Sequence, residues 1–75
     1  MDNRKKLTQK EITIAKKVKE LRQERKLTQE KLAERTHLST THIGMVEIGK
    51  RRMSMKTLQK IANVLGVKVK DLIPF

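Results

Sequence analysis

A local pattern of apolar and hydroxyl residues recurs along the chain: an apolar residue, then Ser or Thr, then a second apolar residue four positions after the hydroxyl. The hydroxyl can accept hydrogen bonds from free backbone N–H groups at a helix start, and the two apolar residues can pack across the first turn. The pattern therefore predicts four helix starts, at Leu7-Thr8…Ile12, Leu27-Thr28…Leu32, Leu38-Ser39…Ile43 and Met53-Ser54…Leu58. Glu11 lies three residues after Thr8, which predicts a capping box at the first start.

A fifth copy of the pattern, Val67-Lys68…Leu72, has lysine in place of the hydroxyl, so it predicts a short final helix with a weaker start. Helix ends are marked by residues that favour a left-handed or broken backbone, namely His37, Gly49, Gly66 and Pro74. No strand-like alternation competes with these helices. We predict an all-α fold, a compact five-helix domain over residues 1–75 with a basic N-terminal extension (1–7) and a helical core (8–73).

Helical spacing separates buried from exposed positions within the predicted helices. The core stripes are Ile14, Val18 and Leu21 in the first helix and Leu58, Ile61, Ala62 and Leu65 in the fourth. The third helix has an inner side defined by Ile43, Val46 and Ser39. Its opposite side consists of Thr41, Gly44, Met45 and Ile48, with Thr40 at the edge. This outer side carries no charged residue.

Charge is distributed unevenly along the chain, which has 19 Lys and Arg against 8 acidic residues and a formal net charge of +11. Residues 1–26 carry net +6, residues 27–49 carry −1 and residues 50–75 carry +6. Clustered cations favour a polyanionic partner, because they release condensed counterions from a phosphate backbone. A basic surface that only confers solubility is the simpler alternative, and charge alone does not distinguish nucleic acid from a membrane surface.

Composition disfavours several other functions. The chain has no cysteine, and His37 and His42 fall on different elements, so we expect neither a catalytic constellation nor a metal site, and no cofactor. No apolar run is long enough to cross a bilayer, and no apolar signal region follows the first six residues, so we expect a cytoplasmic protein. The first helix lacks the Trp or Phe belt of an interfacial helix, which disfavours binding to a membrane surface.

Five residues fall at the key positions of a helix-turn-helix unit made by the second and third helices: Gln29, Ala33, His37, Ile43 and Val46. With these residues, the segment from Leu27 to Ile73 resembles the lambda-repressor/Cro-like, or XRE, family of DNA-binding domains, and the first helix aligns as well. The resemblance implies a sequence-specific, double-stranded DNA-binding transcriptional regulator whose third helix reads the major groove. His37 departs from the family, which usually has glycine there because the turn needs a positive φ; histidine tolerates that region at some strain.

The resemblance also implies roles for individual residues. The candidate base-reading residues are Gln29, Thr40, Thr41 and Met45. The candidate phosphate-binding residues are Gln29, His42, Lys50, Arg51 and Arg52. The outer face of the third helix lacks Arg, Asn and Gln, whose side chains make bidentate base contacts, so we expect modest direct readout. Gly44 lowers helix propensity, and either a close approach to DNA or tight packing would explain its presence.

Two further contacts are implied by the resemblance. Family members often pair an arginine of the first helix with the glutamate of a segment like "VEIGK", which implies a structural ion pair between Arg22 and Glu47. Related domains also place two copies on a palindrome, which implies a homodimer. Val69, Ile73 and Phe75 lie beyond the core stripe of the fourth helix and form the expected dimer interface. The alternative is that Phe75 folds back onto the core of its own chain.

Family members of similar length include phage Cro-like repressors, restriction-modification controller proteins and antitoxins. The segment "THIGMVEIGKRRMSMKTL" resembles the controllers. We expect double-stranded DNA and a second copy of the chain as partners, without a small-molecule effector, because 75 residues leave no room for a sensor domain. An antitoxin or other protein-interaction module, and a basic protein that binds membrane surfaces, remain alternatives. The residues do not separate an activator from a repressor.

Overall fold

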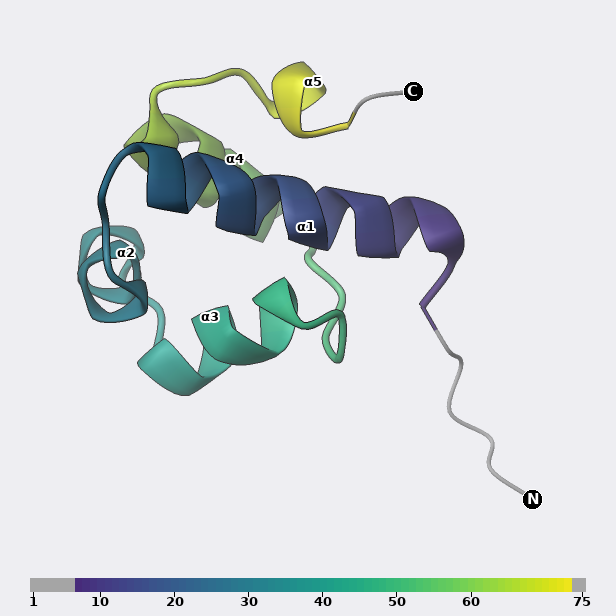
Figure 1. The fold of residues 1–75 in the computed structure, drawn as a ribbon, viewed down its shortest axis with the longest axis horizontal. Helices are drawn as coiled ribbons and strands as arrows, with labels where there is room; N and C mark the ends of the chain where they lie inside the picture. The colour runs from purple at the N-terminus through teal and green to yellow at the C-terminus, as the bar shows by residue number, and fades with distance from the viewer. Residues whose placement is uncertain (1–6, 74–75) are drawn as a thin grey trace.

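The computed structural model describes residues 7–73, which form five α-helices (Figure 1). The helices are α1 (Gln9–Glu24), α2 (Gln29–Thr36), α3 (Thr40–Glu47), α4 (Met55–Leu65) and α5 (Val69–Leu72). No strand occurs within residues 7–73, so the predicted all-α fold with five helices is confirmed. The proposed extension over residues 1–7 lies outside the described residues except for Leu7.

Hydroxyl caps begin the first four helices, as the repeated pattern predicts. The capping residues Thr8, Thr28, Ser39 and Ser54 all have an extended backbone, and each side chain accepts a hydrogen bond from the N–H three residues later. Glu11 completes the predicted capping box, since its Oε1 accepts the Thr8 N–H at 2.8 Å. The start of α5 differs because Lys68 provides no side-chain cap, and the Lys68 N–H instead donates to Asp71 Oδ2 at 2.9 Å.

Left-handed residues end the helices at three of the predicted places. Gly49 follows α3 with φ of 76°, and Gly66 ends α4 with φ of 73°. His37 ends α2 with φ of 60°, so histidine does adopt the conformation that this turn needs. The sequence pattern did not predict Lys26, a second non-glycine residue with positive φ (56°) in the link between α1 and α2. The stop predicted at Pro74 lies outside the described residues.

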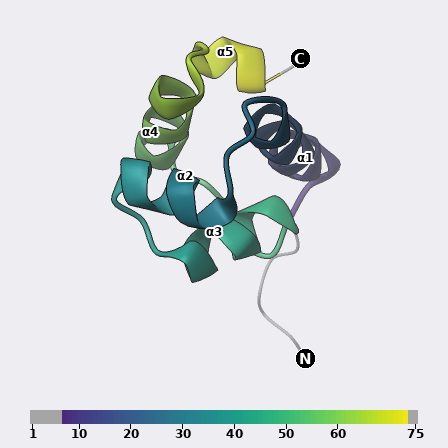
Figure 2. The same cartoon turned by 60° about the vertical axis from the view of Figure 1, so that its left-hand side comes forward.

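The hydrophobic core lies between α1, α2, α3 and α4, with α5 closing the side opposite α3 (Figure 2). The predicted stripe of α4 is buried throughout, and Val18 and Leu21 of α1 are buried as predicted. Ile14 is only half-buried, whereas Ala15 is 2% exposed and was not predicted as core. The remaining buried apolar residues, from α2, α3 and α5, are Leu32, Ala33, Ile43, Val46 and Leu72. This core fixes α3 at the surface with one face outward.

Candidate nucleic-acid interface

The third helix has the two-faced arrangement predicted from its spacing. Its inner residues Ile43 and Val46 are fully buried. Ser39, predicted on the same side, is instead exposed, because it caps the helix and its hydroxyl accepts the His42 N–H at 3.0 Å. On the outer side, Met45 and Ile48 are 37% and 64% exposed, and Thr41 is exposed as well. Both ribbon views place α3 along one edge of the molecule, with no other helix outside it (Figures 1 and 2). The outer face of α3 is therefore an open, uncharged surface that another macromolecule could contact.

The ion pair predicted between Arg22 and Glu47 is present and buried. Arg22 Nε lies 2.6 Å from Glu47 Oε2, and Arg22 Nη2 donates to Glu47 Oε1 at 3.0 Å. The two side chains are 10% and 1% exposed. Arg22 Nη1 also donates to the Leu27 carbonyl at 2.7 Å. These contacts tie the last turn of α1, the start of the helix-turn-helix unit and the end of α3 together.

Gln29 joins this ion pair, which the sequence pattern did not predict. Its Nε2 donates to Glu47 Oε1 at 3.0 Å, so the amide at the start of α2 is held by a buried carboxylate of α3. Because Nε2 is the donor, the amide oxygen of Gln29 is left as an acceptor. A Cβ placed on Gly44 would lie 3.8 Å from that oxygen. The base-reading and phosphate-binding roles expected for Gln29 stay predictions.

Gly44 is not required by the packing of the described residues. An added Cβ there would meet nothing closer than the 3.8 Å contact with Gln29, which is an ordinary van der Waals distance. Gly44 also has no positive φ that would demand glycine. Tight packing inside the domain therefore does not explain why this position is glycine. A close approach from outside the domain stays a prediction.

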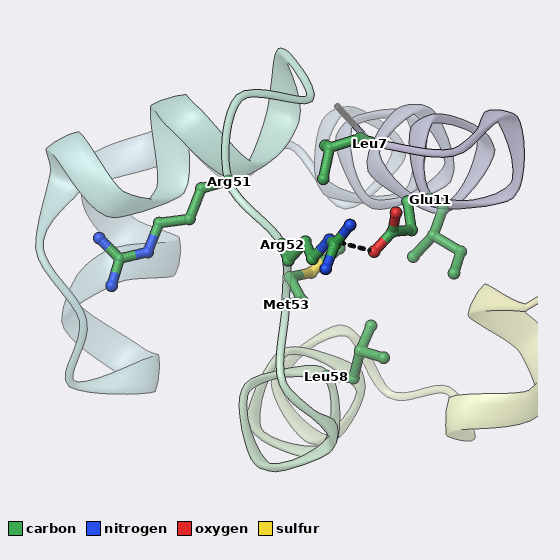
Figure 3. Close-up of a pocket in the computed structure, with 7 residues that line it drawn as sticks. Leu7, Glu11, Arg51, Arg52, Met53 and Leu58 are labelled. Carbon is green, nitrogen blue, oxygen red and sulfur yellow. Dashed lines mark ion pairs between the residues drawn. The ribbon is translucent and has the colours of Figure 1, made fainter. Parts of the chain in front are cut away.

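The basic loop after α3 presents Lys50, Arg51 and Arg52, all of which are exposed. The two arginines point in opposite directions (Figure 3). Arg52 is directed toward the start of α1, where its Nε lies 2.8 Å from Glu11 Oε2. Arg51 is directed away from Glu11. The contact between Arg52 and Glu11 was not predicted, since the capping pattern accounted for Glu11 without the loop.

His42 lies on α3 and is half-buried. Burial lowers the pKa of its imidazole below the ordinary histidine value, and the positive charge of Arg51 lowers the pKa further. The imidazole is therefore biased toward its neutral form in the free protein. A phosphate beside His42 would have the opposite effect on the imidazole pKa, because a negative charge favours the protonated form.

The structure describes two of the three residues expected to form the dimer interface. Val69 and Ile73 are half-buried and pack against the core, so part of each side chain remains accessible. Phe75 lies outside the described residues. In both ribbon views α5 lies on the far side of the fold from α3 (Figures 1 and 2). A contact through α5 would therefore leave the outer face of α3 open.

Features of the described residues also bear on functions other than nucleic-acid binding. Residues 7–73 contain no group of three or more His, Asp or Glu side chains placed to hold a metal ion. Over the same residues, none of the helices combines the length and the apolar character needed to cross a membrane. The fully buried side-chain nitrogen and oxygen atoms of residues 7–73 all have hydrogen-bond partners. The buried polar groups are thus accounted for by the fold itself.

Two helices joined by a tight turn, with the second helix exposed along one face, define a helix-turn-helix domain. A family model described as "Helix-turn-helix" matches residues 18–72, and the chain belongs to this XRE-type, lambda-repressor-like family. Members of the family are DNA-binding transcriptional regulators rather than enzymes.

Similar proteins support this assignment. The control protein C.BamHI of Bacillus amyloliquefaciens is 37% identical over 65 residues, which cover 85% of this chain and 80% of that protein. The immunity repressor protein of Bacillus phage phi105 is 36% identical over 62 residues, covering 83% of this chain but 43% of the repressor, so the chain spans less than half of that relative. The restriction-modification controller protein C.AhdI from Aeromonas hydrophila has a TM-score of 0.79 and 31% identity, covering 81% of this chain and 92% of that one.

Proposed function

We propose that the chain is a sequence-specific, double-stranded DNA-binding transcriptional regulator that acts as a homodimer on a palindromic operator. The observation that carries the proposal is the open, uncharged outer face of α3 with a basic loop directly after it. A neutral helix can enter the major groove and contact base edges, while cations beside it neutralise phosphates on the groove walls. This separation of base contacts from phosphate contacts accounts for the nearly neutral segment 27–49 within a strongly basic chain.

Phosphate contacts are assigned to residues around the ends of α2 and α3. Lys50 and Arg51 are exposed in the loop, and His42 is half-buried on α3, where the positive charge of Arg51 contributes to the lowering of its pKa. Gln29 begins α2, where free backbone N–H groups and the positive end of the helix favour an anion. Arginine suits this role because its planar guanidinium bonds phosphate oxygens in a fixed geometry.

Base contacts are assigned to Thr40, Thr41 and Met45 on α3 and to Gln29, whose amide lies near Gly44 of the same helix. Threonine hydroxyls can bond several bases, and the methyl groups of Thr and Met suit the C5-methyl of thymine. Because no bidentate donor occurs on this face, each contact discriminates modestly. We infer that much of the specificity comes from combining two half-sites and from DNA shape.

Dimerisation is assigned to the accessible parts of Val69 and Ile73, together with Phe75. A single helix-turn-helix reads too few base pairs to select one site, whereas two copies related by a two-fold axis read half-sites about 34 Å apart. Within this class, we favour a controller-type regulator or a Cro-like repressor, since the similar proteins include C.BamHI and C.AhdI as well as a phage repressor. A cytoplasmic location accords with this function.

Selection from random duplex DNA tests the proposal directly. The expected result is enrichment of a palindrome with half-sites about one helical turn apart. Affinity for the selected duplex should fall steeply with salt, because several phosphate contacts release counterions. Failure to enrich any sequence would contradict specific DNA binding. Binding to anionic phospholipid vesicles as strong as binding to the duplex would favour the membrane-surface alternative instead.

A further inference from the structure

Both carboxylate oxygens of Glu11 are engaged, each by a different part of the chain. Oε1 accepts the Thr8 N–H at 2.8 Å and completes the cap of α1. Oε2 lies 2.8 Å from Nε of Arg52, a residue of the loop after α3 (Figure 3). The Glu11 and Arg52 side chains are 30% and 48% exposed. One acidic side chain therefore links the start of the first helix to the loop beside the proposed reading helix.

The surrounding contacts place this loop against α1 independently of the ion pair. Gly49 lies close enough to α1 that an added Cβ would be 3.7 Å from Ile12 Cγ1 and 3.8 Å from Leu7 Cδ1. A pocket between α1, the loop and α4 is lined by Leu7, Glu11, Ile14, Arg51, Arg52, Met53 and Leu58. The aliphatic part of Arg52 can cover such apolar surface while its guanidinium meets the carboxylate.

The neighbouring arginine is in a different situation. Within residues 7–73, no carboxylate lies within ion-pair distance of Arg51, and its side chain is directed away from Glu11 (Figure 3). Two consecutive arginines in one exposed loop thus differ in whether their charge is already compensated. An arginine that is already paired with a carboxylate displaces fewer counterions from DNA when it meets a phosphate, because the carboxylate partly cancels its positive charge before binding.

We propose that Glu11 is a positioning residue that holds Arg52 against the start of α1 and so withholds it from the DNA phosphates, leaving Arg51 to contact them. This inference rests on the proposed DNA-binding function and refines it, since the family resemblance implies phosphate contacts for both arginines. By pairing with Arg52, Glu11 lowers by one the number of cations that contribute to sequence-independent affinity for DNA. A regulator that must leave bulk DNA to find its operator benefits from such a reduction.

The first test compares the two arginines in the otherwise unchanged protein. Arg51→Gln and Arg52→Gln remove the same charge from adjacent positions, and affinity for a mixed-sequence duplex is measured over a range of salt. Loss of one phosphate contact reduces the slope of log affinity against log salt by about 0.9. We expect that loss for Arg51→Gln and a much smaller change for Arg52→Gln. Equal losses for both variants would overturn the inference.

The second test releases Arg52. Glu11→Gln keeps an amide oxygen that can accept the Thr8 N–H, but it removes the negative charge beside Arg52. We expect the salt slope to steepen by up to about 0.9 and the affinity for mixed-sequence DNA to rise several-fold at low salt. This gain should disappear in the double variant Glu11→Gln/Arg52→Gln. Glu20→Gln is the matched control, because it makes the same charge change at an exposed position of α1.

Other outcomes are informative as well. A gain that persists in the double variant, or that Glu20→Gln reproduces, would mean a general charge effect and would contradict the role of Glu11. If the unchanged protein bound no DNA, the proposed function itself would fail, which is a different result.

The third test needs no variant and follows the NMR resonance of each arginine Nε–H. On adding duplex DNA, the Arg51 signal should shift and the Arg52 signal should stay. The reverse pattern would overturn the inference.

Discussion

Arg22 of α1 and Glu47 of α3 form a buried, bidentate ion pair, with Nε 2.6 Å from Oε2 and Nη2 3.0 Å from Oε1. The pair is joined by Gln29, whose Nε2 donates to the same Glu47 Oε1. Removing either charged partner would leave the other buried without compensation. The orientation of α3 and the position of Gln29 therefore depend on one polar network.

Breaking this pair should destabilise the domain strongly. We expect Arg22→Met or Glu47→Gln to reduce the free energy of unfolding by roughly 3–5 kcal/mol, because each leaves a buried charge or hydrogen-bonding group unpaired. The double variant should lose less than the sum of the two single losses. Thermal and urea unfolding of the four proteins measures the difference. Glu34→Gln is the control, since its pair with Lys31 is largely exposed and should contribute little. Additive losses would mean that the contact contributes no coupling.

Base readers and phosphate contacts should respond differently to substitution. Thr41→Ala or Met45→Ala should relax the preference at one position of each half-site, at a cost of roughly 1–3 kcal/mol at most. Arg51→Ala should weaken binding to all sequences alike and flatten the salt dependence. Selection profiles and titrations with specific and mixed-sequence duplexes measure both effects. If Arg51→Ala changed the sequence preference and Thr41→Ala did not, α3 would not be the main reader.

Gly44→Ala separates stability from DNA binding. The added methyl group fits beside Gln29, so the α3 helix should become more stable, by about 0.5–1 kcal/mol. If the backbone at Gly44 approaches DNA closely, the same methyl group should weaken operator binding by roughly tenfold, which corresponds to about 1.4 kcal/mol. Unfolding curves and binding titrations of one variant provide both values. A more stable protein with unchanged DNA affinity would show that nothing outside the domain requires this glycine.

His42 should make DNA affinity depend on pH. Burial and the Arg51 charge lower its pKa in the free protein, whereas a nearby phosphate would raise that pKa in the complex. Binding would then take up a proton, so affinity should rise as pH falls from about 7 to about 5.5. Over the same range the free protein should lose stability, because the unfolded chain binds more protons at this histidine. His42→Gln should remove most of the pH dependence, while His37→Asn, which keeps a residue tolerant of positive φ, should retain it.

The dimer can be tested at Ile73, which is half-buried at the end of α5. In a two-fold dimer, Ile73→Lys would place like charges near each other, so we expect sedimentation to show a folded monomer with much weaker binding to the palindrome. Removal of residues 74–75 should weaken the dimer as well if Phe75 contributes. Met55→Lys is the control, because Met55 is 62% exposed and lies outside the proposed interface. A variant that stays dimeric would place the interface elsewhere, and one that unfolds would favour a role of this end in the core.

Local sequence determined the helices of this protein. Each hydroxyl cap acts on an N–H three residues away, and the left-handed ends at His37, Gly49 and Gly66 depend on single residues that tolerate a positive φ, so neither needs information from distant parts of the chain. The left-handed Lys26 after α1 is the exception. The core of α4 followed from helical spacing for the same reason. The resemblance to a known family supplied the pairing of Arg22 with Glu47, which spacing alone could not.

Tertiary structure decided what those residues meet. Glu11 satisfies its capping pattern completely with Thr8, so nothing in the sequence indicated that its second oxygen would reach Arg52. The bond from Gln29 to Glu47 and the position of the Gln29 amide beside Gly44 were equally hidden. These features depend on distances between residues far apart in the chain, and those distances exist only after the apolar faces of the helices have packed together. Packing selects which polar side chains become neighbours, whereas the local pattern determines only which face of each helix they occupy.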